Sequence, residues 1–467
     1  MFKWFDSAAK HPLSSPRKAK EVLADLPKDN PQELLDELSV WMESLGSAGL
    51  QSRVEVLQLF DQFAQPACRA LEQEYLASGQ GRSGRTGHVL HRFHELLGNS
   101  LSFCVESYRS GEKGAGEVRR QIPQLLCRTM KALGSRYRWE HLHAGFVSED
   151  IWEKLYRLYA YAEKTGNAHL PFVLYPVQGR QTSIAREFLK TLMIACSAPD
   201  SLAPREFGIA CHLASLLSHH FVISPHQAYT HYVDLASMKA PSRLKSPLPN
   251  SSMLRFFGAG KAFEVMVMLS DDSSNGVVRQ ITRGGEFPLE TTRMVLKHLQ
   301  AQWQSQPKSR SHSRLRTSVP IQVARNLDLS DVETWTSENI SESGFDAVPL
   351  QVPAWEKVSL LFFSGRERPS NLCIIRRMNR DAARRWHIGA EILSSHLHPV
   401  QLSAAGLNLN GLLVRMDERK VEIAVETTGF SSTERYEADL GGKMHTLIPL
   451  ELLGRGSGFN LWRFHIA

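Results

Sequence analysis

The chain has 467 residues, 42% of them hydrophobic, so it can form two or three globular domains and is not a disordered protein. Its formal net charge of +7 permits an anionic partner, but charged residues of both signs make up 22% of the chain, which argues against a wholly basic surface. The six cysteines are widely spaced and form no CxxC pair, so they indicate neither a disulfide framework nor a zinc knuckle.

The N-terminal sequence gives no sign of export. It reaches Asp6 and Lys10 without the apolar segment that a signal peptide needs. No later stretch approaches the ~18 consecutive apolar residues of a membrane-spanning helix. We therefore expect a cytoplasmic protein without a membrane span.

Residues 30–46 carry the clearest helix signal. Asn30 supplies a capping oxygen, Pro31 suits the first turn, and Glu33 lies three residues after the cap. Apolar residues then recur on one face: Leu34, Leu38, Trp41 and Leu45. This pattern predicts a helix that ends at Gly46.

The same helical period recurs through most of the first 303 residues. It appears in the segments 54–63, 90–101, 117–134, 149–164, 182–198, 205–220 and 289–303. Residues 235–278 give no clear pattern, because three prolines interrupt them. We find no fixed repeat period. Residues 1–303 are therefore expected to form an α-helical domain of helix pairs, in one or two subdomains.

The sequence changes character after Gln304. Ser, Gln, Lys and Arg fill residues 304–318, which are expected to form a basic linker. Short β-branched and apolar runs follow at 319–325, 345–352, 358–364, 371–378, 386–393, 411–416, 420–427, 444–450 and 459–466. A β region therefore follows the helical domain.

The linker lies in an interval without acidic residues. Between Glu290 and Asp328 the chain has seven cations and no carboxylate, so a bound anion would meet little opposing charge. Arg310 and Arg314 form an R-x-x-x-R element there, whose spacing can direct two guanidinium groups at one ligand. Such groups suit phosphates and the O6/N7 edge of guanine.

A second polar element follows 25 residues after Arg314. It is the N-x-S-x-x-G sequence formed by Asn339, Ser341 and Gly344 at an expected turn between strands. Asn and Ser offer short polar groups, and Gly permits close approach of the backbone. Each element alone is more often an ordinary linker or turn.

Together and in this order, the two elements resemble the paired signature of PilZ domains, which are bacterial receptors for cyclic di-GMP. The segments 376–381 and 386–392 resemble the late strands of the same family. The resemblance spans residues 310–395. It departs from the family's pattern at Ser309, where many members have another arginine, and at Asn339, where Asp is more frequent.

The resemblance implies a fold and a set of ligand-binding residues. Together with the helical period of the first half, it predicts a segregated α+β fold, in which an all-α N-terminal domain (1–303) and the linker precede a PilZ-like antiparallel β-barrel (319–395). Residues 396–467 form either a β extension or a second small β domain. The implied cyclic di-GMP ligands are Arg310, Arg314, Asn339, Ser341 and Gly344, with support from Lys308, Arg316, Arg377 and Gly389.

Nothing in the sequence indicates catalysis, so we expect a protein that is not an enzyme and has no metal or cofactor. The chain has no Walker A loop, nucleophile elbow or dinucleotide fingerprint. Its 19 histidines show no strong metal-ligand spacing. The sequence Arg-Gly-Gly-Glu-Phe at 283–287 imitates a diguanylate cyclase loop, but it lacks the second acid and is interpreted as a glycine turn.

The expected mechanism is that cyclic di-GMP bridges the linker and the 339–344 turn and changes how the helical domain sits on the barrel. The helical domain would then alter its contact with an unidentified protein partner in motility or biofilm control. A rival hypothesis is a ligand-free PilZ-like scaffold that acts through protein contacts. A nucleic-acid partner is not expected, because the basic interval lacks interleaved aromatic residues.

Overall fold

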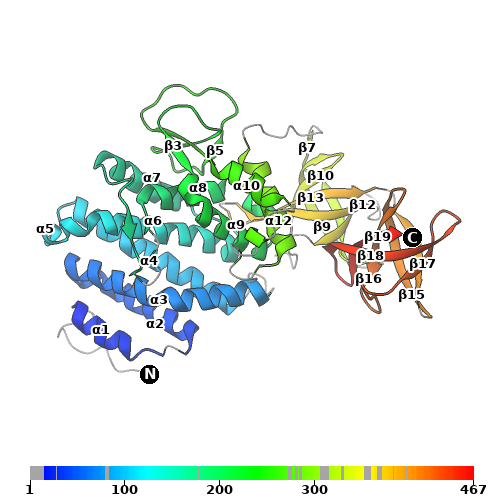
Figure 1. Cartoon of the computed structure of the whole chain (residues 1–467), viewed down its shortest axis with the longest axis horizontal. Coiled ribbons are helices and arrows are strands. Elements are labelled where there is room, and N and C mark those ends of the chain that lie inside the picture. The colour runs from blue at the N-terminus through cyan, green and yellow to red at the C-terminus, as the bar shows by residue number, and fades with distance from the viewer. Residues whose placement is uncertain are drawn as a thin grey trace. The chain divides into compact units, whose positions relative to one another are not determined.

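The computed structural model separates a helical part of the chain from a β part (Figure 1). Apart from residues 200–203, one compact unit comprises residues up to 308 and the other comprises residues from 309. The α+β class expected from the sequence is confirmed. The structure describes residues 15–27, 29–78, 84–176, 179, 181–271, 276–278, 282, 287–304, 315–327, 331–351, 359–364, 371–381, 383–395, 397–404 and 406–467.

The first unit is built mainly from α-helices. Their bounds are α1 Pro16–Ala24, α2 Pro31–Ser44, α3 Leu50–Ser78, α4 Arg85–Arg109, α5 Ala115–Val118, α6 Ile122–Trp139, α7 Glu149–Lys164, α8 Ile184–Ala195, α9 Pro204–Leu217, α10 Ala262–Ser270 and α12 Leu289–Trp303. Short 3-10 or π turns lie at 45–47, 119–121, 140–144, 199–201 and 218–220. Each helical segment expected from the periodicity overlaps one of these helices.

Helix α2 shows why the sequence signals were informative. The Asn30 side chain accepts a hydrogen bond from the backbone N–H of Glu33 at 3.2 Å, and its amide donates to the Glu33 carboxylate at 3.2 Å. The first of these bonds satisfies a backbone donor that the first helical turn leaves free, and the second holds the two side chains together. The helix ends at Ser44 rather than Gly46, and a 3-10 turn completes the segment.

The core of this unit lies where α6 packs between α4 and α8. Helices α4 and α6 approach closely at Gly98, where an added Cβ would lie 3.2 Å from the side chain of Leu133. Aromatic rings fill the contact between α7 and α8, where Tyr159 and Phe188 stack with centroids 4.3 Å apart. Both rings are fully buried.

The first unit also contains strands, which differs from the all-helical expectation. β3 Val222–Ser224, β4 His231–Asp234, β5 Ser242–Arg243 and β6 Leu254–Gly258 form an antiparallel sheet in the order β3-β6-β4-β5, and β1 Phe172–Val173 pairs with β2 Gln181–Thr182. These strands have two to five residues, too few to show an alternating pattern. None of the described helices of the chain has the length and apolarity to cross a membrane.

The second unit begins with a closed six-stranded barrel. Its elements are β7 Leu315–Arg316, β8 Pro320–Ala324, β9 Val332–Ser341, β10 Gly344–Pro349, β11 Leu360–Ser364, β12 Asn371–Arg380 and β13 Trp386–Ser394. The strands pair antiparallel in the order β8-β9-β10-β13-β12-β11, and β11 pairs with β8 to close the barrel. The short β7 pairs with the C-terminal end of β9, at Asn339 and Ile340. Buried side chains such as Trp335, Phe345 and Ile388 fill the interior.

The rest of the second unit forms another closed barrel. Its strands are β14 His398–Ala404, β15 Leu407–Met416, β16 Lys420–Glu426, β17 Tyr436–Asp439, β18 Met444–Arg455 and β19 Phe459–Ile466. They pair in the order β14-β15-β16-β19-β18-β17, and β17 pairs with β14. Leu402, Val421 and Phe464 are among the residues of its interior.

The two barrels share an apolar cluster. Leu360, Phe362 and Ile374 of the first barrel belong to it together with Phe459 and Leu461 of the second. The rings of Phe362 and Phe459 have centroids 5.3 Å apart. Burial of aromatic surface between the barrels joins them into one unit.

Candidate functional site

The N-x-S-x-x-G element forms the hairpin between β9 and β10. Ser341 and Gly344 are the last paired residues of the two strands. The Ser341 hydroxyl donates to the Gly344 carbonyl at 3.1 Å. A side chain at Gly344 would collide with the backbone carbonyl of Ala390 on β13. The hairpin therefore needs glycine at this position because another strand passes directly over it.

Five residues on neighbouring strands form a continuous row across the barrel. Arg316 of β7 pairs with Asn339 of β9, and Asn339 pairs with Asp346 of β10. Asp346 pairs in turn with Gly389 of β13, and Gly389 pairs with Arg377 of β12. Directly paired residues lie on the same face of a sheet. We call these five residues the outer row.

The outer row faces away from the barrel interior. The adjacent row consists of Ile340, Phe345, Ala390 and Ile375, which belong to the apolar core or pack against it. Side chains alternate between the two faces of a strand, so the outer row lies on the opposite face. Gly389 lies between Asp346 and Arg377 in this row, and a Cβ there would come within 2.7 Å of the Asp346 Oδ1 and 3.3 Å of the Arg377 side chain.

Asp346 ties the outer row together. Its carboxylate accepts a hydrogen bond from the Asn339 amide at 2.8 Å and another from the Arg377 guanidinium at 2.5 Å. The side chain of Asp346 is 7% exposed, whereas that of Arg377 is 42% exposed. A buried carboxylate needs such partners, and in return it fixes the positions of both donors.

The contact with Asp346 also sets the orientation of Asn339. An ionised carboxylate can only accept, so the Asn339 Nδ2 must face Asp346 and the Oδ1 must face away. That Oδ1 is buried and has no hydrogen-bond partner within the described part of the chain. A buried acceptor without a partner costs about 1–3 kcal/mol. The site therefore offers an oriented acceptor to a ligand that can donate.

Acidic residues beside the outer row have partners of their own. Glu391 pairs with Arg376 at 2.6 Å, and His387 lies between Glu338 at 2.9 Å and Asp381 at 3.2 Å. A backbone hydrogen bond from Arg385, with help from the His387 and Arg385 side chains, lowers the pKa of Asp381 to about 2. These carboxylates are thus engaged by neighbouring residues of the same barrel.

The structure reaches only part of the expected site. Lys308, Arg310 and Arg314 lie outside the described residues. Arg316 is described and exposed, and it pairs with Asn339. The expected residues that the structure brings together in one row are Arg316, Asn339, Gly389 and Arg377, with Ser341 and Gly344 at the adjoining turn.

Asp346 is the residue that sequence reasoning missed. It lies within an apolar run, Gly344 to Pro349, where an acid is unexpected. An acidic residue inside a buried strand is a signal that it has a fixed partner. The pairing with Asn339 and Arg377 is set by strand register, which the sequence alone does not reveal.

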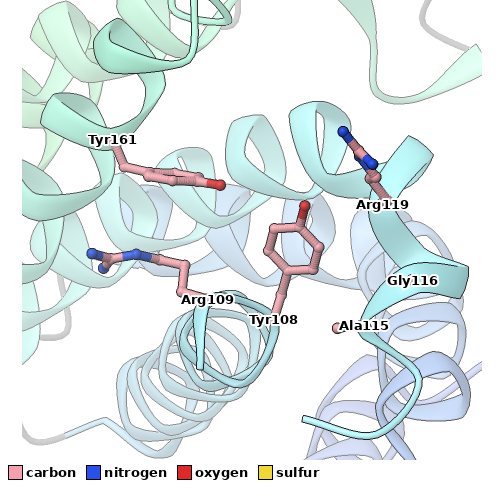
Figure 2. A pocket seen from close by; sticks show the side chains of 6 residues that line it. All are labelled: Tyr108, Arg109, Ala115, Gly116, Arg119 and Tyr161. Carbon is pink, nitrogen blue, oxygen red and sulfur yellow. The ribbon is translucent and has the colours of Figure 1, made fainter. Parts of the chain in front are cut away.

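A hollow on the helical unit is a weaker candidate. It has a volume of about 470 Å³ and is lined by Tyr108, Arg109, Ala115, Gly116, Arg119 and Tyr161. Figure 2 shows the hydroxyl groups of Tyr108 and Tyr161 directed toward the same space. Arg109 lies over the Tyr161 ring at 5.2 Å and pairs with Glu106 at 3.0 Å, so its charge is already engaged. Among the described residues no group of three or more His, Cys, Asp or Glu side chains could hold a metal ion.

A comparison with known families relates the helical part of the chain to a receptor. Residues 17–227 match the model of the family described as cyclic-di-GMP receptor FimW, N-terminal domain. This range begins within α1, ends just after β3 and covers a little under half of the chain. It includes no residue of either barrel. No curated protein matches the sequence.

Proposed function

We propose that the protein is a receptor for cyclic di-GMP and that the ligand binds to the outer row of the first barrel. The observation that carries this proposal is the Asn339 Oδ1, a buried acceptor oriented by Asp346 and left without a partner in the described residues. Its neighbours in the row are Arg316 and Asp346, and Arg377 is the second arginine of the same row.

The chemistry of the row fits a guanine-containing dianion. Guanine offers an amino donor to the Asn339 oxygen and accepts at O6 and N7 from a guanidinium group. The phosphates of cyclic di-GMP suit arginines, and the Ser341 hydroxyl could donate to a phosphate by turning away from the Gly344 carbonyl. Arg316 and Arg377 are the described cations of the row.

The paired arginines of the linker would complete the site. Arg314 immediately precedes Leu315, the first residue of β7, and Arg310 lies four residues earlier. The strand β7 brings the chain to Asn339. We infer that the first barrel is a PilZ-type domain and that Arg310 and Arg314 hold the phosphates and guanine edges from the linker side, with Lys308 nearby.

Two separate parts of the chain support the same ligand. The arginine pair and the N-x-S-x-x-G element lie between residues 310 and 344, whereas the match to the cyclic-di-GMP receptor family ends at residue 227. Because the two ranges share no residue, neither finding depends on the other. This agreement favours a receptor over an enzyme.

The position of the linker suggests how the signal is transmitted. Residues 304–314 connect α12, the last described helix, to β7, which contacts the site. A ligand held by Arg310 and Arg314 would change the conformation of this connection, and the helical unit would change its contact with a protein partner. Motility or biofilm machinery is the proposed setting.

A calorimetric titration tests the receptor proposal. The full-length wild-type protein is titrated with cyclic di-GMP, with GTP and cyclic di-AMP as matched ligands. We expect saturable binding of cyclic di-GMP alone. If a well-folded protein binds none of the three, the alternative of a ligand-free scaffold is preferred, in which the Asp346–Arg377 pair is only structural.

A further inference from the structure

The two barrels have the same topology. If the six barrel strands of each are numbered in chain order, both barrels have the strand order 1-2-3-6-5-4, and strand 4 pairs with strand 1 to close the ring. All neighbouring strands in both are antiparallel. Many other strand orders could close a six-stranded barrel, so this agreement calls for a closer comparison.

Irregularities of pairing also coincide. Between the second and third strands, one extra residue interrupts the register: Glu338 in the first barrel and Val414 in the second. Between the fifth and sixth strands the extra residues are Arg376 and Leu450. Bulges are built features of a β-fold rather than random defects. These two coincidences align the barrels residue by residue around the outer row, whereas a third irregularity, at Leu393 in the first barrel and at Leu453 in the second, falls at different positions.

This register aligns the outer row with four residues of the second barrel. There Arg415 pairs with Glu422, Glu422 with Arg463, and Arg463 with Glu451. The equivalent residues of the first barrel are, in the same order, Asn339, Asp346, Gly389 and Arg377. The interior neighbours agree as well, since Val421 and Phe464 are core residues like Phe345 and Ala390.

The turns of the two sites have equal length but different chemistry. The six residues from Asn339 to Gly344 correspond to the six from Arg415 to Lys420. The positions of Asn339, Ser341 and Gly344 are occupied by Arg415, Asp417 and Lys420. The short polar groups and the glycine of the first hairpin are therefore absent from the second.

The position of Gly389 carries the largest difference, because Arg463 takes its place. Arg463 donates to Glu422 at 2.8 Å on one side and to Glu451 at 2.5 Å on the other. Its side chain lies between the two acids, which satisfy its charge, whereas the space beside Gly389 in the first barrel is taken by the paired side chains of Asp346 and Arg377. Glu451 also puts a carboxylate where the first barrel has Arg377.

The second barrel also lacks a basic segment before its first strand. No lysine or arginine occurs between residues 386 and 414, which includes the approach to β14 and the whole of that strand. In the first barrel, the approach to β8 contains Arg310, Arg314 and Arg316. A phosphate-containing ligand would therefore find its counter-charges at one barrel only.

We infer that the second barrel is a structural repeat of the first in which the ligand site is closed, and that Gly389 is the specificity-determining position of the first site, because only glycine lets Asp346 and Arg377 pair directly beside it. This inference rests on the proposed function. It implies that cyclic di-GMP binds at the first barrel alone. The second barrel packs against the first through the shared apolar cluster and supports it.

The test transfers the closing residue to the open site in the full-length protein. Gly389→Arg adds a cation, which on electrostatic grounds alone would favour an anionic ligand. We expect it instead to weaken cyclic di-GMP binding at least ~100-fold, because the new side chain would occupy the row and pair with Asp346 as Arg463 pairs with Glu422. Arg463→Ala and Arg415→Ala are matched controls that should bind with wild-type affinity and stoichiometry.

A second variant covers the case in which Gly389→Arg does not fold, which circular dichroism and thermal unfolding would show. Gly389→Ala adds only a Cβ, which would lie 2.7 Å from the Asp346 Oδ1 and 3.3 Å from the Cβ and Nε of Arg377, so this ion pair would have to shift. The substitution should still weaken binding, by about 10-fold.

Binding by folded Gly389→Arg or Gly389→Ala at wild-type affinity would overturn the inference and leave the receptor proposal standing. A change of stoichiometry in Arg463→Ala would also overturn it. Failure of the wild type to bind would instead overturn the receptor proposal.

Discussion

The amide of Asn339 donates to the carboxylate of Asp346 at 2.8 Å across strands β9 and β10. This hydrogen bond turns the Asn339 oxygen away from Asp346, because the carboxylate can take only the donor side of the amide. The same carboxylate holds Arg377. One buried acid thus positions an acceptor and a cation on the same face of the first barrel.

Removal of the Asn339 side chain should weaken ligand binding without unfolding the barrel. Asn339→Ala deletes the oriented oxygen, and loss of one such hydrogen bond corresponds to about a 10-fold to 100-fold higher Kd. Calorimetry with cyclic di-GMP measures the effect. Asn410→Ala is a matched control, because Asn410 is an asparagine of the second barrel bonded to Glu426 at 3.1 Å. Equal affinities of the two variants would contradict the assignment of Asn339.

The arginine pair of the linker should contribute more. Arg310→Ala with Arg314→Ala removes two guanidinium groups, and charge-assisted hydrogen bonds are each worth about 1.5–3 kcal/mol, so we expect at least ~100-fold weaker binding. Arg325→Ala is the control from the same basic interval, because Arg325 is engaged by Glu333 at 2.5 Å and Asp331 at 3.2 Å. Comparable losses of affinity in the double variant and in Arg325→Ala would show that the positive charge of the interval, rather than this arginine pair, favours binding.

Gly344 should be required for the stability of the first barrel. Gly344→Ala places a methyl group against the backbone carbonyl of Ala390, and overpacking of this kind costs typically about 1–3 kcal/mol of unfolding free energy. Chemical denaturation measures that loss. Lys420→Ala changes the equivalent residue of the second hairpin, which is exposed, and should stay within about 0.5 kcal/mol of the wild type. An unchanged unfolding free energy in Gly344→Ala would contradict this role and show that β10 and β13 can move apart at this point.

His94 should make the stability of the helical unit depend on pH. Burial in α4 is the main cause that lowers the pKa of His94 from 6.5 to about 3. The unfolded chain therefore binds a proton between these values that the folded chain does not, so the unfolding free energy falls as the pH drops from about 6.5 toward 3. The slope for one group is at most about 1.4 kcal/mol per pH unit. Denaturation of His94→Gln across this range should show a smaller slope, and identical slopes would contradict this role.

The sequence predicted elements well where local signals agree. Asn30 and Glu33 marked the start of α2, and the apolar runs at 371–378 and 386–393 marked β12 and β13. Strand β9 was missed, because its polar residues hide the pattern. Ser337 is fully buried there and bonds to the backbone of Val319, a contact that only the folded barrel supplies.

The sequence motif of the site was predictable, but the cross-strand pairing that forms the outer row was not. Asn339, Ser341 and Gly344 could be recognised from their spacing, whereas Asp346 becomes a partner of Asn339 only through the register of β9 and β10. The relation between the barrels was hidden for the same reason. Gly389 and Arg463 share no chemistry, and only strand order and bulges place them at one position.

Hydrogen–deuterium exchange with and without cyclic di-GMP tests the central claim most directly, because it locates the ligand on the full-length chain. We expect ligand-dependent protection of backbone amides in peptides covering residues 308–316 and 337–346, and unchanged exchange in peptides covering residues 413–422 of the second barrel. Protection confined to the second barrel or to the helical unit, or no protection at saturating ligand, would contradict a cyclic di-GMP site on the outer row.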